Sequence, residues 1–171
     1  MKIDAKVQSI SKLKDYFFLV PDYQREYVWK PDDEVEQFLI DIENEYSPDA
    51  KEQRNYFLGS IIIVNNDRCF DVVDGQQRLT TIMLSLCVFR DLLKKETLNS
   101  AQKNYLQIIE NLLYNFDIES GETRVRLELQ YEESHDYLTA LIQEQPYNGV
   151  RSPSICLLYT SPSPRDQRGS R

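Results

Sequence analysis

The sequence has few of the residues that build covalent or metal-bound frameworks. Its 171 residues include three cysteines, Cys69, Cys87 and Cys156, and a single histidine, His135. An odd number of cysteines without CxxC spacing indicates neither a disulfide framework nor a zinc site. We therefore expect reduced thiols and a fold that depends on its apolar core, for which a 41% hydrophobic content is sufficient.

Long apolar runs and an excess of positive charge are also missing. No run approaches the roughly 18 apolar residues of a membrane span, and no signal-peptide pattern follows Met1. The net charge of −8 opposes sequence-independent binding to nucleic acid, because such binding needs many Lys and Arg side chains in contact with phosphates. We predict a cytoplasmic protein without a membrane partner, and a small basic pocket is compatible with its charge.

Residues 152–171 differ in character from the rest of the chain. They show no helical or strand period and hold three of the seven prolines, which indicates a disordered tail. Residues 156–166 also resemble the translation of a transposase adapter from sequencing libraries. We interpret 152–171 as a non-native tail and 1–151 as one domain, truncated at its C-terminal end, and expect the natural protein to continue.

Apolar periodicity predicts a mixed α+β domain without internal repeats. A β-hairpin is expected from residues 56–64 and 69–73, with turn residues 65–68 between them. The helix that follows the hairpin is apolar on most of its surface, so it belongs in the centre of the domain. The other expected elements are a short helix at 9–15, a strand at 16–20, helices at 31–46 and 105–116, a strand at 124–129 and a last helix from Glu133.

The turn between the hairpin and the central helix reads Asp74-Gly75-Gln76-Gln77-Arg78. Gly75 permits a sharp turn and a close ligand, and the first amides of the helix lack intrahelical partners. Amide side chains and a guanidinium follow, and a guanidinium holds phosphate oxygens in bidentate fashion. The turn therefore has the chemistry of a phosphate-binding site. For Thr80 and Thr81, we expect bonding back to the helix.

A structural interpretation of the same turn stays open. Asp74 is also a suitable N-cap, with Gln77 in the answering position of a capping box. Capping and phosphate binding use the same helix end and are compatible.

A second polar cluster occupies residues 22–29, in a loop between a predicted strand and a helix. Arg25 is a candidate second phosphate ligand, and a base would find a stacking surface in Tyr23, Tyr27 or Trp29. The alternatives are core packing for the aromatic rings and a solvated ion pair for Arg25. If one phosphate chain is bound, Arg25 and Arg78 should face the same concavity, because each contact is short.

Four segments, taken in order, resemble a known family: 20–29 (VPDYQREYVW), 38–41 (FLID), 56–61 (YFLGSI) and 73–81 (VDGQQRLTT). They resemble the N-terminal domain of the GmrSD-type modification-dependent restriction proteins, and with 124–142 the resemblance covers about residues 7–145. It implies a ParB/sulfiredoxin-like α+β fold with a β-hairpin, a central buried helix and further packed helices. It also implies that the DGQQR turn belongs to a nucleoside triphosphatase centre.

The resemblance further implies roles for individual residues. The expected catalytic residues are Asp74, Gln77 and Arg78, with Asp74 holding Mg²⁺ or orienting a water. The expected nucleotide- and phosphate-binding residues are Gly75, Gln76, Gln77, Arg78, Gln24, Arg25 and Tyr23. His135 is expected to be exposed or capping, and no HNH-like constellation occurs in the chain.

Three functions stay open at this point. The first is an NTP-hydrolysing regulatory domain of a restriction or antiphage protein, which would meet DNA through a C-terminal HNH-type nuclease domain that this sequence does not include. The second is a nucleotide-sensing module without turnover, and the third a DNA-binding ParB-like domain. The base preference and homo-oligomer formation are also open.

Overall fold

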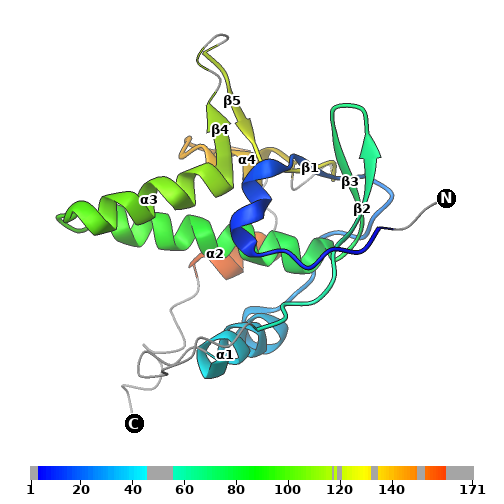
Figure 1. Ribbon diagram of the computed structural model, residues 1–171, viewed down its shortest axis with the longest axis horizontal. Coiled ribbons are helices and arrows are strands. Elements are labelled where there is room, and N and C mark those ends of the chain that lie inside the picture. Colours follow the sequence, from blue (N-terminus) through cyan, green and yellow to red (C-terminus); the bar gives the residue numbers. More distant parts are fainter. Residues whose placement is uncertain are drawn as a thin grey trace.

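A four-stranded mixed sheet organises the domain. The computed structural model describes residues 4–45, 56–116, 118, 121–131, 135–149 and 153–160. The strand order is β2-β3-β1-β6, and the bounds are β1 Phe18–Val20, β2 Ile62–Asn66, β3 Cys69–Asp74 and β6 Leu127–Leu129 (Figure 1). β1 runs parallel to both β3 and β6, whereas β2 is antiparallel to β3. The expected β-hairpin is therefore formed by β2 and β3.

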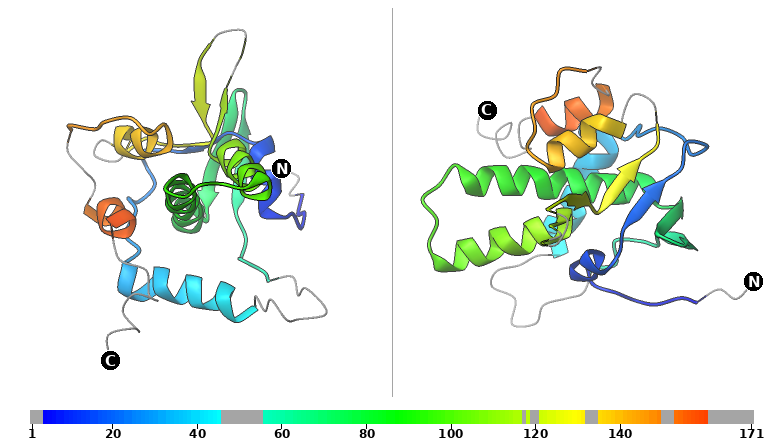
Figure 2. Two further views of the ribbon diagram at one scale, coloured as in Figure 1. Left: turned by 90° about the vertical axis from the view of Figure 1, so that its left-hand side faces the viewer. Right: turned by 90° about the horizontal axis from the view of Figure 1, so that it is seen from above.

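The longest helices of the domain lie side by side. α2 (Gln76–Lys94) lies beside α3 (Ser100–Leu113), and α5 (Pro153–Thr160) also contacts α2 (Figure 2). The remaining helical segments are η1 (Ile10–Asp15), η2 (Pro31–Val35), α1 (Glu36–Glu45) and α4 (His135–Ile142). A two-stranded sheet of β4 (Tyr114–Phe116) and β5 (Thr123–Val125) extends from the end of α3.

α2 is the centre of the core. Its residues Leu79, Met83, Leu84 and Cys87 have no exposed surface, and they pack with strand residues such as Val20. The predicted α+β class and the central buried helix are thus confirmed. In the described part of the chain, no helix combines the length and the apolar character needed to cross a bilayer.

Two element boundaries differ from those predicted. The first hairpin strand begins at Ile62 rather than at residue 56, because Gly59 adopts φ +102° and interrupts the extended chain. α3 begins at Ser100, since Asn99 and Gln102 form a capping box, and it ends at Leu113. Phe116, which we expected in this helix, lies in β4.

The strand predicted over 124–129 is divided between two sheets. Val125 pairs with Tyr114, whereas Leu127 pairs with Phe18. Arg126 joins them: its amide donates to the Leu113 carbonyl and its carbonyl accepts from the Phe18 amide, both at 2.8 Å. Alternating burial predicted the extended backbone correctly but carried no information on its pairing partners.

The tail prediction is wrong for residues 153–160. They form α5, and Ile155 is fully buried in the core. The domain boundary at 151 and the non-native origin of the tail stay predictions. Residues 161–171, the expected helix start at Glu133 and helix end at Tyr46, and the side chain of His135 lie outside the described part of the structure.

Candidate functional site

Sheet topology brings the two sequence motifs together. β3, β1 and β6 are parallel, so their carboxyl ends open at the same edge of the sheet. β3 continues into the DGQQR turn, β1 into the loop 21–30, and β6 into Tyr131. Ligand sites of open sheets form at this edge, because loops from neighbouring strands converge there.

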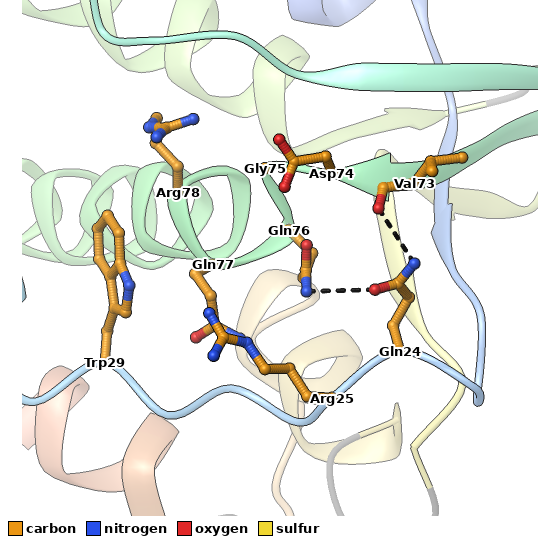
Figure 3. Close-up of a pocket in the computed structure, with 9 residues that line it drawn as sticks. All are labelled: Gln24, Arg25, Trp29, Val73, Asp74, Gly75, Gln76, Gln77 and Arg78. Carbon is orange, nitrogen blue, oxygen red and sulfur yellow. Dashed lines mark hydrogen bonds between the residues drawn. The ribbon is translucent and has the colours of Figure 1, made fainter.

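A pocket of about 380 Å³ lies at this edge (Figure 3). Both Arg25 and Arg78 line it, so the two arginines share one concavity, as we predicted. The complete lining is Gln24, Arg25, Trp29, Val73, Asp74, Gly75, Gln76, Gln77 and Arg78. The pocket therefore contains the whole DGQQR turn and part of the loop after β1.

Gly75, and not Asp74, is the N-cap of α2. It adopts φ +89°, and no side chain caps this helix end. A Cβ on Gly75 would lie 2.9 Å from the Ser60 carbonyl oxygen, so the position has no space for another residue. The capping box that we considered for Asp74 and Gln77 does not form, and in the described part of the chain no side chain accepts from the first amides of α2.

Gln77 holds the loop after β1 in place. Its Nε2 donates to the Glu26 carbonyl and its Oε1 accepts from the Val28 amide, both at 2.8 Å. The side chain is only 5% exposed. Because both ends of the amide are occupied, Gln77 positions the loop rather than presenting a free donor to a phosphate.

Gln24 and Gln76 link the two motifs across the pocket. Gln76 Nε2 donates to Gln24 Oε1 at 3.3 Å, and Gln24 Nε2 donates to the Val73 carbonyl at 3.1 Å (Figure 3). On the far side of the loop, the Tyr131 hydroxyl donates to the Arg25 carbonyl at 2.6 Å. The loop is thus anchored to β3, to α2 and to the segment after β6.

Arg78 is held by a segment that sequence reasoning did not assign to the site. Its Nη1 donates to the Ser60 carbonyl at 2.7 Å. A Cβ on Gly59 would lie 2.7 Å from Arg78 Cζ, so the guanidinium packs directly on this glycine. In the sequence, Phe57-Leu58-Gly59-Ser60 contributes only to the family resemblance. Its glycine is the one residue that indicates a close contact with another part of the chain.

Within the described residues, neither Arg25 nor Arg78 makes an ion pair. Asp74 is the one carboxylate among the residues that line the pocket. No cluster of three potential metal ligands occurs in the described part of the chain. The pocket is consequently richer in uncompensated positive than in negative side chains, which suits an anion.

The three candidate aromatic residues differ in their exposure and in whether they line the pocket. Tyr23 is 72% exposed and does not line the pocket. Tyr27 is buried, and its hydroxyl bonds the Thr81 hydroxyl at 2.8 Å, while Thr81 donates back to the Gln77 carbonyl as expected. Burial raises the pKa of Tyr27 to about 12. Trp29 alone of the three lines the pocket.

Comparison with known families is decisive for the identity of the domain. The model of the N-terminal domain of the GmrSD restriction endonuclease matches residues 7–155. The chain belongs to this family. It is the N-terminal domain of a restriction-type defence protein, and the GmrSD match includes the buried Ile155. No curated protein matches the chain.

Proposed function

We propose that this GmrSD N-terminal domain binds a nucleoside triphosphate at the DGQQR turn and hydrolyses it. The observation that carries the proposal is the placement of Arg25 and Arg78 in one pocket at the N-terminus of the 19-residue helix α2. A helix N-terminus presents free amides and the positive end of the helix dipole. Guanidinium groups add charge-assisted hydrogen bonds to phosphate oxygens.

The roles of the pocket residues differ in this proposal. Arg78 and Arg25 bind phosphate oxygens, together with the first backbone amides of α2. Gln24, Gln76 and Gln77 fix the loop that carries Arg25. Tyr23, which lies outside the pocket, has no part.

Asp74 is the residue that would hold a metal ion. Mg²⁺ commonly binds through one or two carboxylates together with substrate phosphates, so a single pocket carboxylate fits an ion that arrives with the nucleotide. Bound there, Mg²⁺ would neutralise charge on the phosphate oxygens. Alternatively, Asp74 itself orients the attacking water, a role that needs only its carboxylate.

The biological role of hydrolysis would be regulatory. GmrSD proteins are restriction endonucleases by description, and this chain has one histidine and no HNH-like constellation. We propose that DNA is cut by an HNH-type nuclease domain outside this sequence, and that the nucleotide state of the pocket controls it.

Two measurements test the proposal. Calorimetric titration with ATP and Mg²⁺ should show one binding site per chain, and phosphate release should exceed that of a protein-free control. Absence of binding in a folded sample would refute the proposal.

One observation favours a nucleotide sensor without turnover as the second candidate. Gln77 is fully engaged by the loop, which leaves Asp74 as the one lining side chain that can act on a water as a base. Binding without phosphate release, in the presence of Mg²⁺, would select this alternative. Direct DNA binding by the domain, the third possibility, would appear as affinity for duplex DNA that falls steeply between two salt concentrations.

A further inference from the structure

Among the described residues, Trp29 is the one aromatic side chain that lines the pocket. It is partly buried and packs against the core from its place in the loop. Its ring lies 6.0 Å from that of Phe38 in α1, at an interplanar angle of 57°. In Figure 3 the indole stands beside the space that Arg78 and the loop enclose. The ring therefore forms a flat apolar wall in a pocket that is lined mainly by polar side chains.

The backbone on both sides of Trp29 is fixed. The Val28 amide donates to Gln77 Oε1 at 2.8 Å, and the Lys30 amide donates to Glu34 Oε2 at 2.9 Å. Together with Phe38, these bonds hold the indole before any ligand arrives. A rigid aromatic surface costs little conformational entropy on binding, because it is ordered in advance.

We propose that Trp29 is the surface on which the base of the bound nucleotide stacks. The inference rests on the proposed function, because it requires that the triphosphate occupies the adjacent arginines and the α2 N-terminus. A nucleotide carries its flat, apolar base at one end and its charged phosphates at the other. The pocket has the same polarity, with the indole on one wall and the DGQQR turn on another.

The hydrogen-bonding groups of the pocket support stacking as the means of base recognition. Both ends of the Gln77 amide are bound to the loop backbone, and the Gln24 amide lies between Gln76 and the Val73 carbonyl. These amides are already committed and are poor readers of a base edge. Stacking on an aromatic face uses the π-surface instead, which every base possesses.

The chain offers a direct readout, because Trp29 is its single tryptophan. We expect ATP to change the intrinsic tryptophan fluorescence on binding. Inorganic tripolyphosphate should compete with ATP for the arginines yet leave the tryptophan emission almost unchanged. If ATP binds by calorimetry and the emission is the same with both ligands, the stacking proposal is wrong while the proposed function stands. If neither ligand binds, the proposed function fails.

Substitutions provide the second test. Trp29→Ala should weaken ATP binding roughly 10-fold or more, as loss of one stacking contact does, and leave the affinity for tripolyphosphate unchanged. Trp29→Phe should retain most of the ATP affinity, which separates stacking from a purely structural loss. Tyr23→Ala is the matched control on the same loop, and a loss of ATP affinity in Tyr23→Ala but not in Trp29→Ala would overturn the proposal.

Discussion

Arg78 is the residue whose surroundings explain most about the site. Its guanidinium is oriented by the Ser60 carbonyl and has no carboxylate partner among the described residues. The positive charge of this oriented guanidinium is not neutralised by a carboxylate. An incoming phosphate can therefore bind it without first breaking an ion pair. Phosphate binding would instead compete with one hydrogen bond to the uncharged Ser60 carbonyl, which is a weaker contact than one to a charged phosphate oxygen.

Arg78→Ala should reduce ATP affinity by roughly 100-fold, because a charged hydrogen-bonding group is lost together with its geometry. Calorimetric titration measures the change. Arg68→Ala removes the same charge from the exposed hairpin turn and should bind ATP like the unaltered protein. Equal affinity in Arg78→Ala and the unaltered protein would rule out the DGQQR turn as the phosphate site.

Gly59 offers a test of how Arg78 is positioned. Gly59→Ala places a Cβ 2.7 Å from Arg78 Cζ at a backbone of φ +102°, so the guanidinium must move. We expect a loss of about 1–2 kcal/mol of stability from the left-handed backbone. ATP binding should weaken on the order of 10-fold, about 1.4 kcal/mol.

Gly121→Ala is the matched control for this substitution. Gly121 also has a positive φ, +72°, but its Cβ would meet no atom within 4 Å. Thermal unfolding should show a comparable destabilisation in both variants, and only Gly59→Ala should lose ATP affinity. A loss of affinity in Gly121→Ala as well would mean that general destabilisation explains both results.

At the scale of elements, the loop after β1 depends on contacts with α2. Gln77→Ala removes two hydrogen bonds and leaves the Glu26 carbonyl and the Val28 amide without their partners, at a cost of about 2 kcal/mol. Because Arg25 and Trp29 sit on this loop, ATP affinity should fall as well. Denaturant unfolding and calorimetry measure the two effects.

Gln102→Ala is the corresponding control in α3. Gln102 belongs to the capping box of that helix, so its loss should cost about 1 kcal/mol without an effect on ATP. If Gln77→Ala retained full ATP affinity, the loop would not need its anchor to bind the nucleotide.

The elements also show what sequence patterns can and cannot predict. Apolar periodicity identified α2 and the β2–β3 hairpin, because burial on one face or all round leaves a pattern in the residues themselves. The division at Arg126 left no such pattern, since either sheet accepts the same alternating residues. We predicted that Arg25 and Arg78 line one pocket only on the assumption of a shared ligand. The physical reason is that β1 pairs in parallel with β3, which places the loops after both strands at the same edge of the sheet.

For the whole molecule, buried phenols and a buried thiol make stability depend on pH in alkaline solution. Burial raises the pKa of Tyr27 and Tyr131 from 10.0, and that of Cys87 from 9.0, each to about 12. In all three cases the folded state holds its proton more tightly than the unfolded state. Their contribution to stability is therefore complete below the unfolded pKa and is lost as pH rises to the folded pKa.

Thermal melting should accordingly be constant with respect to these groups up to about pH 9 and fall between pH 9 and pH 12. Cys87→Ala should reduce the fall in melting temperature that begins near pH 9. Tyr131→Phe should reduce the fall that begins near pH 10. A melting temperature that stays level to pH 12 in the unaltered protein would contradict the assignment.

The buried side chain of Ile155 ties the C-terminal helix α5 to the rest of the domain, so the two should unfold together. Ile155 is fully buried, so Ile155→Ala should lower the free energy of unfolding by about 2–4 kcal/mol. Ile118→Ala, at a side chain that is 86% exposed, should change it by less than about 0.5 kcal/mol. Equal stability of the two variants would indicate that the domain ends before α5.

The central place of β1 has a consequence for the order in which the protein is made. β1 is the first strand to leave the ribosome, yet its two neighbours are β3 and β6, which are synthesised much later. The bond from Tyr131 to the Arg25 carbonyl spans 106 residues of sequence. Contacts of such long range form slowly. The nascent chain thus cannot complete its pocket until residue 131 has emerged, and an incomplete chain has no finished site for the nucleotide.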